Sequence, residues 1–216
     1  MPLVTLASAS PRRRELLRIL LADFHVAPSS FDESAFSPDG KSPENLVVLL
    51  ALGKARAVHK EIGGVVIGAD TVVSLGRRIL GKPRDVEEAR EMLRVLRMDK
   101  HQVVTGLAVI DDSGKTQSEC LGTVVTFRQY TDDEIETYLA TGDSLDKAGA
   151  YAIQHPGFHP ASRIDGCYYN VMGLPLCKLA HMLRQAGVQL DLKKTADLPQ
   201  ECLVPVMDCP LAVLHN

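Results

Sequence analysis

The sequence predicts an α/β protein with a mixed, partly antiparallel sheet and flanking helices. Segments with helical periodicity alternate with short β-rich segments between residues 3 and 187, which is typical of α/β proteins. Two β-rich segments flank a polar turn at residues 111–115. They predict an antiparallel hairpin, which a purely parallel sheet lacks. The length of 216 residues suits one substantial domain or two small lobes around a shared cleft.

The chain starts with a short apolar segment, residues 3–7, which predicts a buried strand leading directly into a helix. Ser10 is the expected N-cap of that helix, and Pro11 suits its first position. Leucines at helical spacing, followed by Phe24, form the stripe that we expect to be buried.

The next two elements are a long helix and a long apolar strand. The helix begins after its expected N-cap Ser42 and ends at Gly63. Residues 65–75 predict a strand that is buried on both faces, although Asp70 interrupts it. Asp70 is either a turn residue between two short strands or a buried carboxyl group. A buried carboxyl group must be protonated, hydrogen-bonded or close to a cation, because an unpaired buried charge is costly.

The second half of the chain predicts three more helices and one hairpin. The helices cover residues 85–98, 131–142 and 174–187, and the hairpin strands cover residues 101–110 and 119–127. Capping-box spacing supports two helix starts, at Asp85 with Glu88 and at Thr131 with Glu134. Periodicity is lost after about residue 190, so we expect one domain at residues 1–190 and a tail at residues 191–216.

Composition and charge argue against several classes of protein. The net charge of −3 gives no global positive field, so we expect no nucleic-acid partner. The five cysteines are odd in number and form no C-x-x-C pair, which favours a reducing cytoplasm over a disulfide framework. The N-terminus does not resemble a signal peptide, and the longest apolar run, residues 46–52, is too short to span a membrane. We therefore expect no membrane association.

Three arginines, residues 12–14, occupy the first turn of the first predicted helix. The helix dipole is positive there and normally favours acidic side chains. The backbone N–H groups, the hydroxyl of Ser8 and the guanidinium groups of Arg12 and Arg13 could instead face one bound phosphate. The alternative is a solvated cluster that Glu15 partly neutralises.

Two loops contain charged residues that suit a phosphate or metal site. Asp32 and Glu33 lie between two phenylalanines and could complete a hard-oxygen site for Mg²⁺ or Mn²⁺. Lys82 lies between a glycine and a proline on a stiff turn. The alternative for each is an ordinary solvated loop residue.

The segment at residues 141–157 combines charged, small and amide side chains. Asp146 and Lys147 precede three small residues that permit a close backbone approach, and the Gln154 amide can both donate to and accept from a nucleobase. His155 and His159 are spaced like zinc ligands on a helix, but the prolines and the glycine around them exclude a helix there.

In their order along the chain, several short segments resemble the Maf family of nucleoside triphosphate pyrophosphatases. They are ASASPRRRELL (7–17), FDES (31–34), ALGKARAV (51–58), GADTVV (68–73), GKP (81–83), VVTGLAVI (103–110), DKAGAYAIQ (146–154) and YNVMGLPL (169–176). The resemblance covers about residues 2–188. It implies a mixed α/β fold with two lobes around a deep cleft, commonly in a homodimer.

The resemblance also implies hydrolysis of a nucleotide between its α and β phosphates, with Mg²⁺ or Mn²⁺ as cofactor. The general base of the family falls on Asp70, and its metal-linked carboxylate falls on Glu33, so that Glu33 and Asp70 would hold the metal. The phosphate-binding residues fall on Ser8, Arg13, Lys54 and Lys82.

The subgroup that acts on dTTP and UTP is marked at three positions, which are Arg12, Thr71 and Gln154 here. Two departures from the family pattern lie nearby. His155 and Pro156 stand where a glycine is usual, and Asp143 replaces a glutamate. They bear on substrate choice more than on the chemistry.

Other functions remain open at this point. A nucleotide-binding regulator of cell division could use the same cationic cleft without turnover, and a degenerate relative could have its pocket closed by the loop at residues 155–156. A nucleic-acid-binding module is opposed by the net charge. The presence of both Asp70 and Glu33 favours the enzyme.

Overall fold

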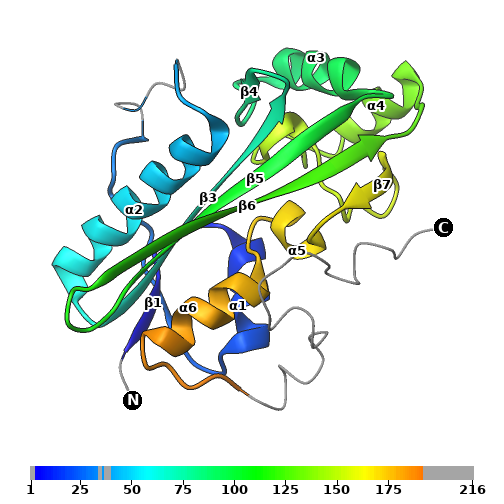
Figure 1. Ribbon diagram of the computed structural model, residues 1–216. Helices are drawn as coiled ribbons and strands as arrows, with labels where there is room; N and C mark the ends of the chain where they lie inside the picture. Colours follow the sequence, from blue (N-terminus) through cyan, green and yellow to red (C-terminus); the bar gives the residue numbers. More distant parts are fainter. Residues whose placement is uncertain (1–2, 34–35, 37–39, 192–216) are drawn as a thin grey trace.

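The computed structural model describes residues 3–33, 36 and 40–191 (Figure 1). Residues 192–216 lie outside this part, so the expected tail at residues 191–216 stays a prediction. Within the described ranges, no helix combines the length and the apolar character that a membrane crossing requires.

One mixed sheet of seven strands forms the centre of the protein. The strands are β1 (Val4–Leu6), β2 (His25–Val26), β3 (Val65–Leu75), β4 (Arg78–Leu80), β5 (Lys100–Ile110), β6 (Thr116–Phe127) and β7 (Ala161–Asp165). The order is β2-β1-β3-β5-β6-β7, and β4 pairs with β3. β1 is parallel to β2 and β3, whereas all the other pairs are antiparallel. The predicted mixed sheet and its hairpin are confirmed.

In the described part of the chain, six α-helices and the short 3₁₀ turn η2 surround the sheet. They are α1 (Pro11–Leu20), α2 (Pro43–Ile62), α3 (Val86–Leu96), α4 (Asp132–Leu139), η2 (Ala148–Ala150), α5 (Tyr168–Val171) and α6 (Leu176–Gln185). The predicted N-caps Ser10, Ser42, Asp85 and Thr131 all accept a hydrogen bond from the third residue beyond them. Thr131 and Glu134 form the full capping box. Glu88 instead accepts from the backbone N–H of Arg84, so the first predicted box is only half formed.

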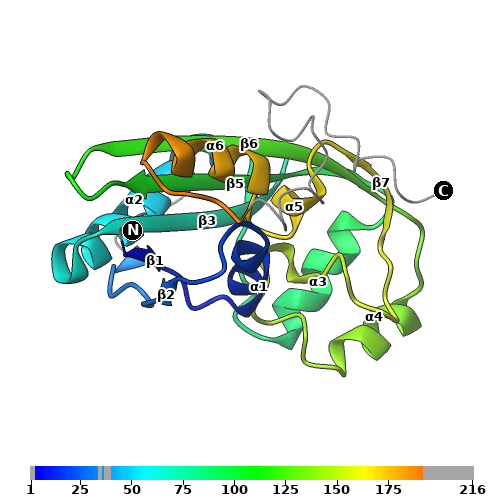
Figure 2. The same cartoon turned by 90° about the horizontal axis from the view of Figure 1, so that it is seen from below.

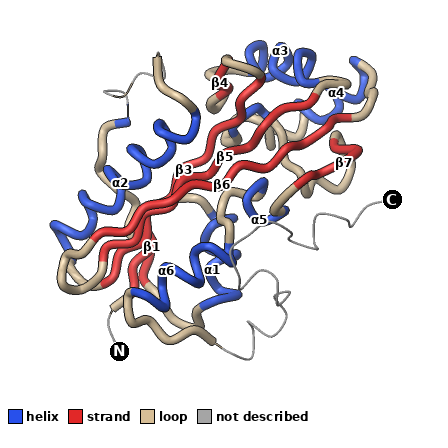
Figure 3. The backbone as a smooth tube through the Cα atoms, viewed as in Figure 1, coloured by secondary structure: helices blue, strands red, loops and turns tan. Residues whose placement is uncertain are grey.

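The helices divide the two faces of the sheet among them. α2 covers one face of the long strands, while α1 with α6 and α3 with α4 lie toward opposite ends of the same strands (Figures 1 and 2). The long strands β3, β5 and β6 run through both ends of the molecule (Figure 3). Alternation along β3 matches this division, because Val65 and Ile67 pack with α1 and α6 whereas Val66 packs with α2.

Four hydrophobic clusters form among the described residues, and the two largest, the first and second cores, match the two lobes that the family resemblance implies. The first core joins α1 and α6 to β1 and to the first half of β3. The second joins α3 and α4 to Val73, Val103 and Phe127 at the other end of the long strands. The space between these cores is the place where a cleft can form.

Two glycines bring α2 close to the sheet. A Cβ atom at Gly68 would lie 2.1 Å from the carbonyl oxygen of Ala51, and one at Gly106 would lie 2.3 Å from that of Val47. Any side chain at either position would push α2 away from the strands. The close approach also sets the distance between α2 side chains and Asp70 on β3.

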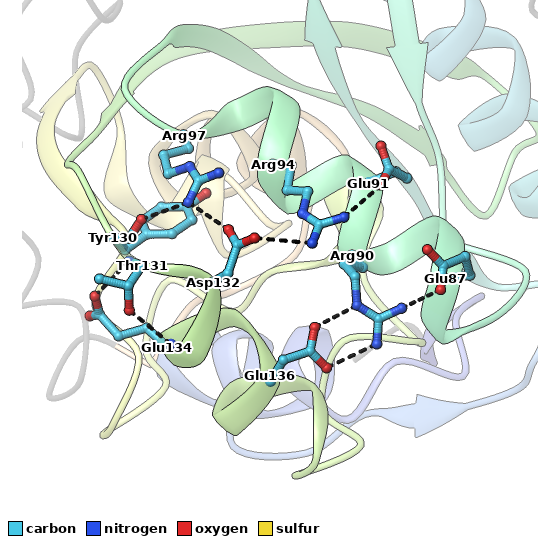
Figure 4. Close-up of polar contacts among 10 residues, drawn as sticks. All are labelled: Glu87, Arg90, Glu91, Arg94, Arg97, Tyr130, Thr131, Asp132, Glu134 and Glu136. Carbon is cyan, nitrogen blue, oxygen red and sulfur yellow. Dashed lines mark hydrogen bonds and ion pairs between the residues drawn. The ribbon is translucent and has the colours of Figure 1, made fainter.

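Arginine–carboxylate pairs fix α3 to α4 on the outer surface of the second lobe (Figure 4). Arg90 donates to both carboxylate oxygens of Glu136, at 2.5 and 2.9 Å. Arg94 and Arg97 both pair with Asp132, at 3.0 and 2.8 Å. Exposed pairs of this kind each contribute little, but the bidentate and shared geometry holds α4 in one orientation. The chain after α4 runs directly to the cleft.

Candidate active site

A cleft of about 350 Å³ lies between the two cores. Its walls come from the β1–α1 connection, the loop after β2, α2, β3, the turn that contains Lys82, the segment around η2, and the end of α5 with the residues that follow it. The expected site residues on these walls are Ser8, Arg12, Arg13, Glu33, Lys54, Asp70, Thr71 and Lys82. They come from segments scattered over the first half of the chain. The structure places these cations and carboxylates around one cleft, and their roles stay a prediction.

Lys54 on α2 faces two carboxylates across the cleft. Its Nζ lies 2.5 Å from Oδ1 of Asp70 and 3.0 Å from Oε1 of Glu33. Lys54 and Asp70 are buried, while Glu33 is exposed. Asp70 lies in the middle of the continuous strand β3, so the alternative of a turn between two short strands was wrong. The cation that a buried Asp70 requires is Lys54.

The side chain of Arg13 is held by acceptors of the protein itself. Its Nε donates to the carbonyl oxygen of Gly173 at 2.9 Å, and its Nη1 donates to that of Ala69 at 2.9 Å and to Oγ of Ser8 at 3.4 Å. Its Nη2 donates to Oγ1 of Thr71 at 2.9 Å. Arg13 therefore ties α1, β3 and the segment after α5 together at the cleft.

Burial is the largest influence on this guanidinium group and lowers the pKa of Arg13 from its ordinary value. The negative charges of Asp70 and Glu33 act in the opposite direction, and Arg12 adds to the lowering. Because a guanidinium group is not deprotonated in proteins, Arg13 contributes one fixed positive charge to the cleft wall.

Thr71 belongs to a directed chain of hydrogen bonds that leaves the cleft. Its Oγ1 lies 2.9 Å from Oγ1 of Thr105, and Thr105 Oγ1 donates to the carbonyl oxygen of Asn170 at 3.2 Å. Because Thr105 has only one hydroxyl proton, Thr71 must be the donor between the two threonines. The chain runs from Arg13 through Thr71 and Thr105 to α5. Thr71 thus has partners within the protein for both its proton and one lone pair.

The opposite wall holds a second buried lysine between two acids. Nζ of Lys147 donates to a carboxylate oxygen of Asp143 and to one of Asp146, each at 2.6 Å. Burial alone would raise the pKa of Asp146, but Lys147, Arg12 and Lys82 outweigh it, and the pKa lies below its ordinary value. Asp143, the shorter replacement for the family glutamate, thus still reaches Lys147.

Lys82 is positioned by a backbone contact with the turn η2. The N–H of Gly149 donates to the carbonyl oxygen of Gly81 at 3.0 Å. Gly149 has a φ of 70°, and a Cβ atom there would lie 2.9 Å from a methyl carbon of Val73. Glycine is required at this point, and its contact links the loop of Lys82 to the loop of Lys147.

Gln154 is the one expected site residue that does not line the cleft. Its side chain is exposed and forms a hydrogen bond with Tyr168 on α5, which opposes the rise in the pKa of Tyr168 that burial causes. The neighbouring His155 turns inward, and its Nδ1 accepts from the N–H groups of Gly157 and Phe158 at 3.2 and 2.9 Å. The loop at residues 155–156 therefore has its hydrogen bonds within its own turn, and neither residue lines the cleft.

The carboxylate oxygens in the cleft are suitable ligands for a hard divalent cation. Oxygens of Asp70 and Glu33 both lie within 3.0 Å of one point, which Lys54 Nζ occupies. Mg²⁺ is typically held by one or two carboxylates, with water and substrate phosphates completing its shell. Across the described residues, no group of three or more His, Cys, Asp or Glu side chains could hold a metal ion. Two carboxylates with phosphate oxygens match the Mg²⁺ pattern. His155 and His159 make separate contacts, with the N–H of Phe158 and the carbonyl oxygen of Pro156.

Sequence reasoning did not find Thr105 or Asn170. Both are fully buried, and both lie in segments that resemble the family, VVTGLAVI and YNVMGLPL. A polar residue within an otherwise apolar strand was the available signal for Thr105, as it was for Asp70. Asn170 lies in a short helix that periodicity cannot reveal.

Comparison with known proteins finds one matching family and several relatives that share one name. The family described as Maf-like protein matches residues 3–186. A dTTP/UTP pyrophosphatase from Clostridium botulinum is 47% identical over 192 residues, which are 87% of this chain and 98% of the relative. Proteins of the same name from Clostridium beijerinckii and Thermococcus gammatolerans are 48% and 45% identical, over 84% and 87% of this chain and 98% of each relative.

Among solved structures, a nucleoside-triphosphatase / dITP/XTP pyrophosphatase from Mycobacterium abscessus aligns with a TM-score of 0.38 and 17% identity. The alignment covers 59% of this chain and 74% of that chain. This likeness is too low to bear on function. The family match and the relatives above cover most of the chain, and the chain belongs to the Maf-like protein family.

Proposed function

We propose that this protein is a nucleoside triphosphate pyrophosphatase that hydrolyses dTTP and UTP to the monophosphate and pyrophosphate, and so removes unwanted nucleotides from the pool. The observation that supports this most is the cleft in which Arg12, Lys54 and Lys82 meet the carboxylates Glu33 and Asp70. Relatives with almost half of their residues identical are named dTTP/UTP pyrophosphatase. Modified pyrimidine nucleotides are included in the proposed substrate class.

Asp70 is the proposed general base. It would accept a proton from the water that attacks the α-phosphate, while the bond between that phosphorus and the bridging oxygen breaks. Its position supports this role, because it projects from a rigid central strand into the cleft. Glu33 and Asp70 would together hold Mg²⁺ or Mn²⁺, which when bound lowers the pKa of a coordinated water and neutralises phosphate charge.

The proposed phosphate contacts are Ser8, Arg13, Lys54 and Lys82. Ser8 and the start of α1 present hydroxyl and N–H donors at the positive end of a helix dipole. Lys54 and Lys82 place point charges on two other walls. Fixed cations of this kind stabilise the charge that develops on the departing pyrophosphate. Arg13 would add a positive charge, although most of its donors serve the protein.

Arg12, Thr71 and Gln154 are the proposed determinants of base choice. Thymine and uracil present two carbonyl acceptors and one N–H donor, which arginine and glutamine side chains can match. Arg12 lines the cleft, and Gln154 lies beside α5, next to the segment that forms the cleft wall at residues 171–173. Thr71 would act through its contacts with Arg13 and Thr105.

The proposal also places the enzyme in the cytoplasm as a homodimer. The family resemblance implies the dimer, and the odd number of cysteines without a C-x-x-C pair favours a reducing compartment. Size-exclusion chromatography with light scattering tests the dimer directly.

Pyrophosphate release from a panel of nucleoside triphosphates, assayed with Mg²⁺ and then with Mn²⁺, tests the proposed function. The expected result is release from dTTP and UTP well above that from purine nucleotides. Release of orthophosphate would contradict cleavage between the α and β phosphates. Nucleotide binding without any release would favour the alternative, a regulator of cell division without turnover.

A further inference from the structure

Lys54 occupies the point at which the two metal-binding carboxylates converge. Its ammonium group lies 2.5 Å from Oδ1 of Asp70 and 3.0 Å from Oε1 of Glu33. A divalent cation held by the same two oxygens would lie between them, at about 2.1 Å from each for Mg²⁺, in the space that the ammonium group occupies. The ammonium group and the metal therefore compete for one position.

The three side chains of this cluster differ in burial and in how their backbones are held. The side chains of Lys54 and Asp70 are each 11% exposed, whereas that of Glu33 is 53% exposed. Asp70 is fixed by the central strand, and the backbone of Lys54 is fixed by the close packing of α2 on Gly68. The flexible parts are the end of the Lys54 side chain and the carboxylate of Glu33.

A phosphate group supplies the force that can move the ammonium group. Lys54 on α2 and Ser8 in the β1–α1 connection both line the cleft, and phosphate is expected at the positive end of the α1 dipole beside Ser8. A triphosphate brings several negative charges into this space and offers Lys54 a new partner. It also brings oxygen ligands for the metal. Both effects favour exchange of the ammonium group for a divalent cation between the carboxylates.

We propose that Lys54 acts as an internal counter-ion that closes the metal site until nucleotide binds. Metal alone binds weakly, because it must displace a buried ammonium group whose partners among the described residues are these two carboxylates. The nucleotide draws Lys54 to its phosphates and opens the site, so metal and nucleotide bind together. This inference deepens the proposed function and rests on it.

Binding of Mn²⁺ in the absence of nucleotide is the decisive measurement. It is followed by the electron paramagnetic resonance signal of free Mn²⁺, for the wild-type protein and for Lys54→Met and Lys54→Gln. Both variants should bind Mn²⁺ at least about tenfold more tightly than the wild type, because a positive charge next to the site is removed. Lys178→Met is the matched control, since Lys178 forms a single exposed pair with Glu119. It should bind Mn²⁺ as the wild type does.

Equal Mn²⁺ affinity of the wild type and the Lys54 variants would overturn the proposal. A measurement on the wild type alone covers the case in which the variants fail to fold. With ¹³C-labelled lysine, the Cε signal of Lys54 should stay in place when Mg²⁺ is added alone and should move when a nonhydrolysable α,β-methylene analogue of dUTP is added. A shift with Mg²⁺ alone would overturn the proposal. Hydrolysis of dTTP in the nucleotide panel would be unaffected by either result, so the two proposals fail separately.

Discussion

The guanidinium group of Arg13 donates to the hydroxyl of Thr71 at 2.9 Å, which joins the first turn of α1 to the strand residue that follows Asp70. This contact explains part of the arginine cluster in the first turn of a helix. Arg13 is directed away from the helix dipole and toward carbonyl and hydroxyl oxygens of β3 and of the segment after α5. The cation thus holds the strand that presents Asp70, the proposed general base.

Replacement of Thr71 by valine should weaken this connection while preserving its shape. Arg13 and Thr105 would each lose a partner, so we expect the free energy of unfolding to fall by about 1–2 kcal/mol. The KM values for dTTP and UTP should change with it, because α5 loses its link to the cleft. Urea denaturation and steady-state kinetics measure the two effects. Thr71→Ser keeps the hydroxyl and should remain close to the wild type; equal losses in both variants would refute the hydroxyl chain.

Asp70→Asn should abolish turnover and leave the fold intact. Loss of a general base typically reduces the rate by about 100-fold or more. The asparagine amide oxygen can still accept from Lys54, and Glu33 remains a second partner, so circular dichroism should be unchanged. Asp133→Asn, on the outer surface of α4, is the control and should retain full activity. A fully active Asp70→Asn enzyme would remove the assignment of the base.

Gln154→Ala should raise the KM for UTP and broaden the choice of base. The side chain is exposed and contacts Tyr168, so its loss should cost little stability and its effect should be confined to substrate choice. Competition between UTP, CTP and GTP measures this choice. Gln185→Ala on α6 is the control. It removes a comparable exposed amide that does not line the cleft, and it should leave base preference unchanged. An unchanged base preference in Gln154→Ala would count against Gln154 as a reader of the base.

Much of the fold is predictable because its start and stop signals are local. The caps Ser10, Ser42 and Thr131 and the apolar run of β3 all lie where the sequence predicts them. The elements that were not predicted include β2, β7 and α5, which have two, five and four residues. Segments this short have little periodicity of their own. β2 and β7 pair with neighbouring strands, and α5 is held by hydrogen bonds between Asn170 and β5.

The sequence indicates which residues form the candidate site, but it does not indicate which of them contact one another. Asp70 stands out because a charge in a buried strand needs a partner, and the structure supplies Lys54, 16 residues earlier. Arg13 reaches the carbonyl oxygen of Gly173, 160 residues away, and no spacing rule relates two such positions. The position of Gln154 outside the cleft walls also depends on the path of a loop, which composition does not determine.

His101 is buried in the second lobe without a charge partner. It is 2% exposed, its Nε2 lies 2.9 Å from the hydroxyl of Tyr151, and its ring packs edge-on against Phe127. Its Nδ1 has no hydrogen-bond partner among the described residues. Burial lowers the pKa of His101 to about 4, and a weaker influence of Asp99 opposes this. The folded protein therefore holds the neutral imidazole.

This burial predicts that the protein loses stability in mild acid. Between pH 6.5 and about 4 the unfolded chain binds a proton at His101 that the folded protein excludes, so the free energy of unfolding falls as the pH decreases. Below about pH 4 the free energy of unfolding is lower by about 3 kcal/mol because of His101, and above pH 6.5 His101 causes no such loss. Urea denaturation of the wild type and of His101→Gln at several pH values isolates this effect from that of the carboxylates. The variant should show a shallower decline, and His181→Gln, on the exposed side of α6, should decline as the wild type does. Identical slopes for all three proteins would mean that His101 is protonated in the folded state as readily as in the unfolded chain.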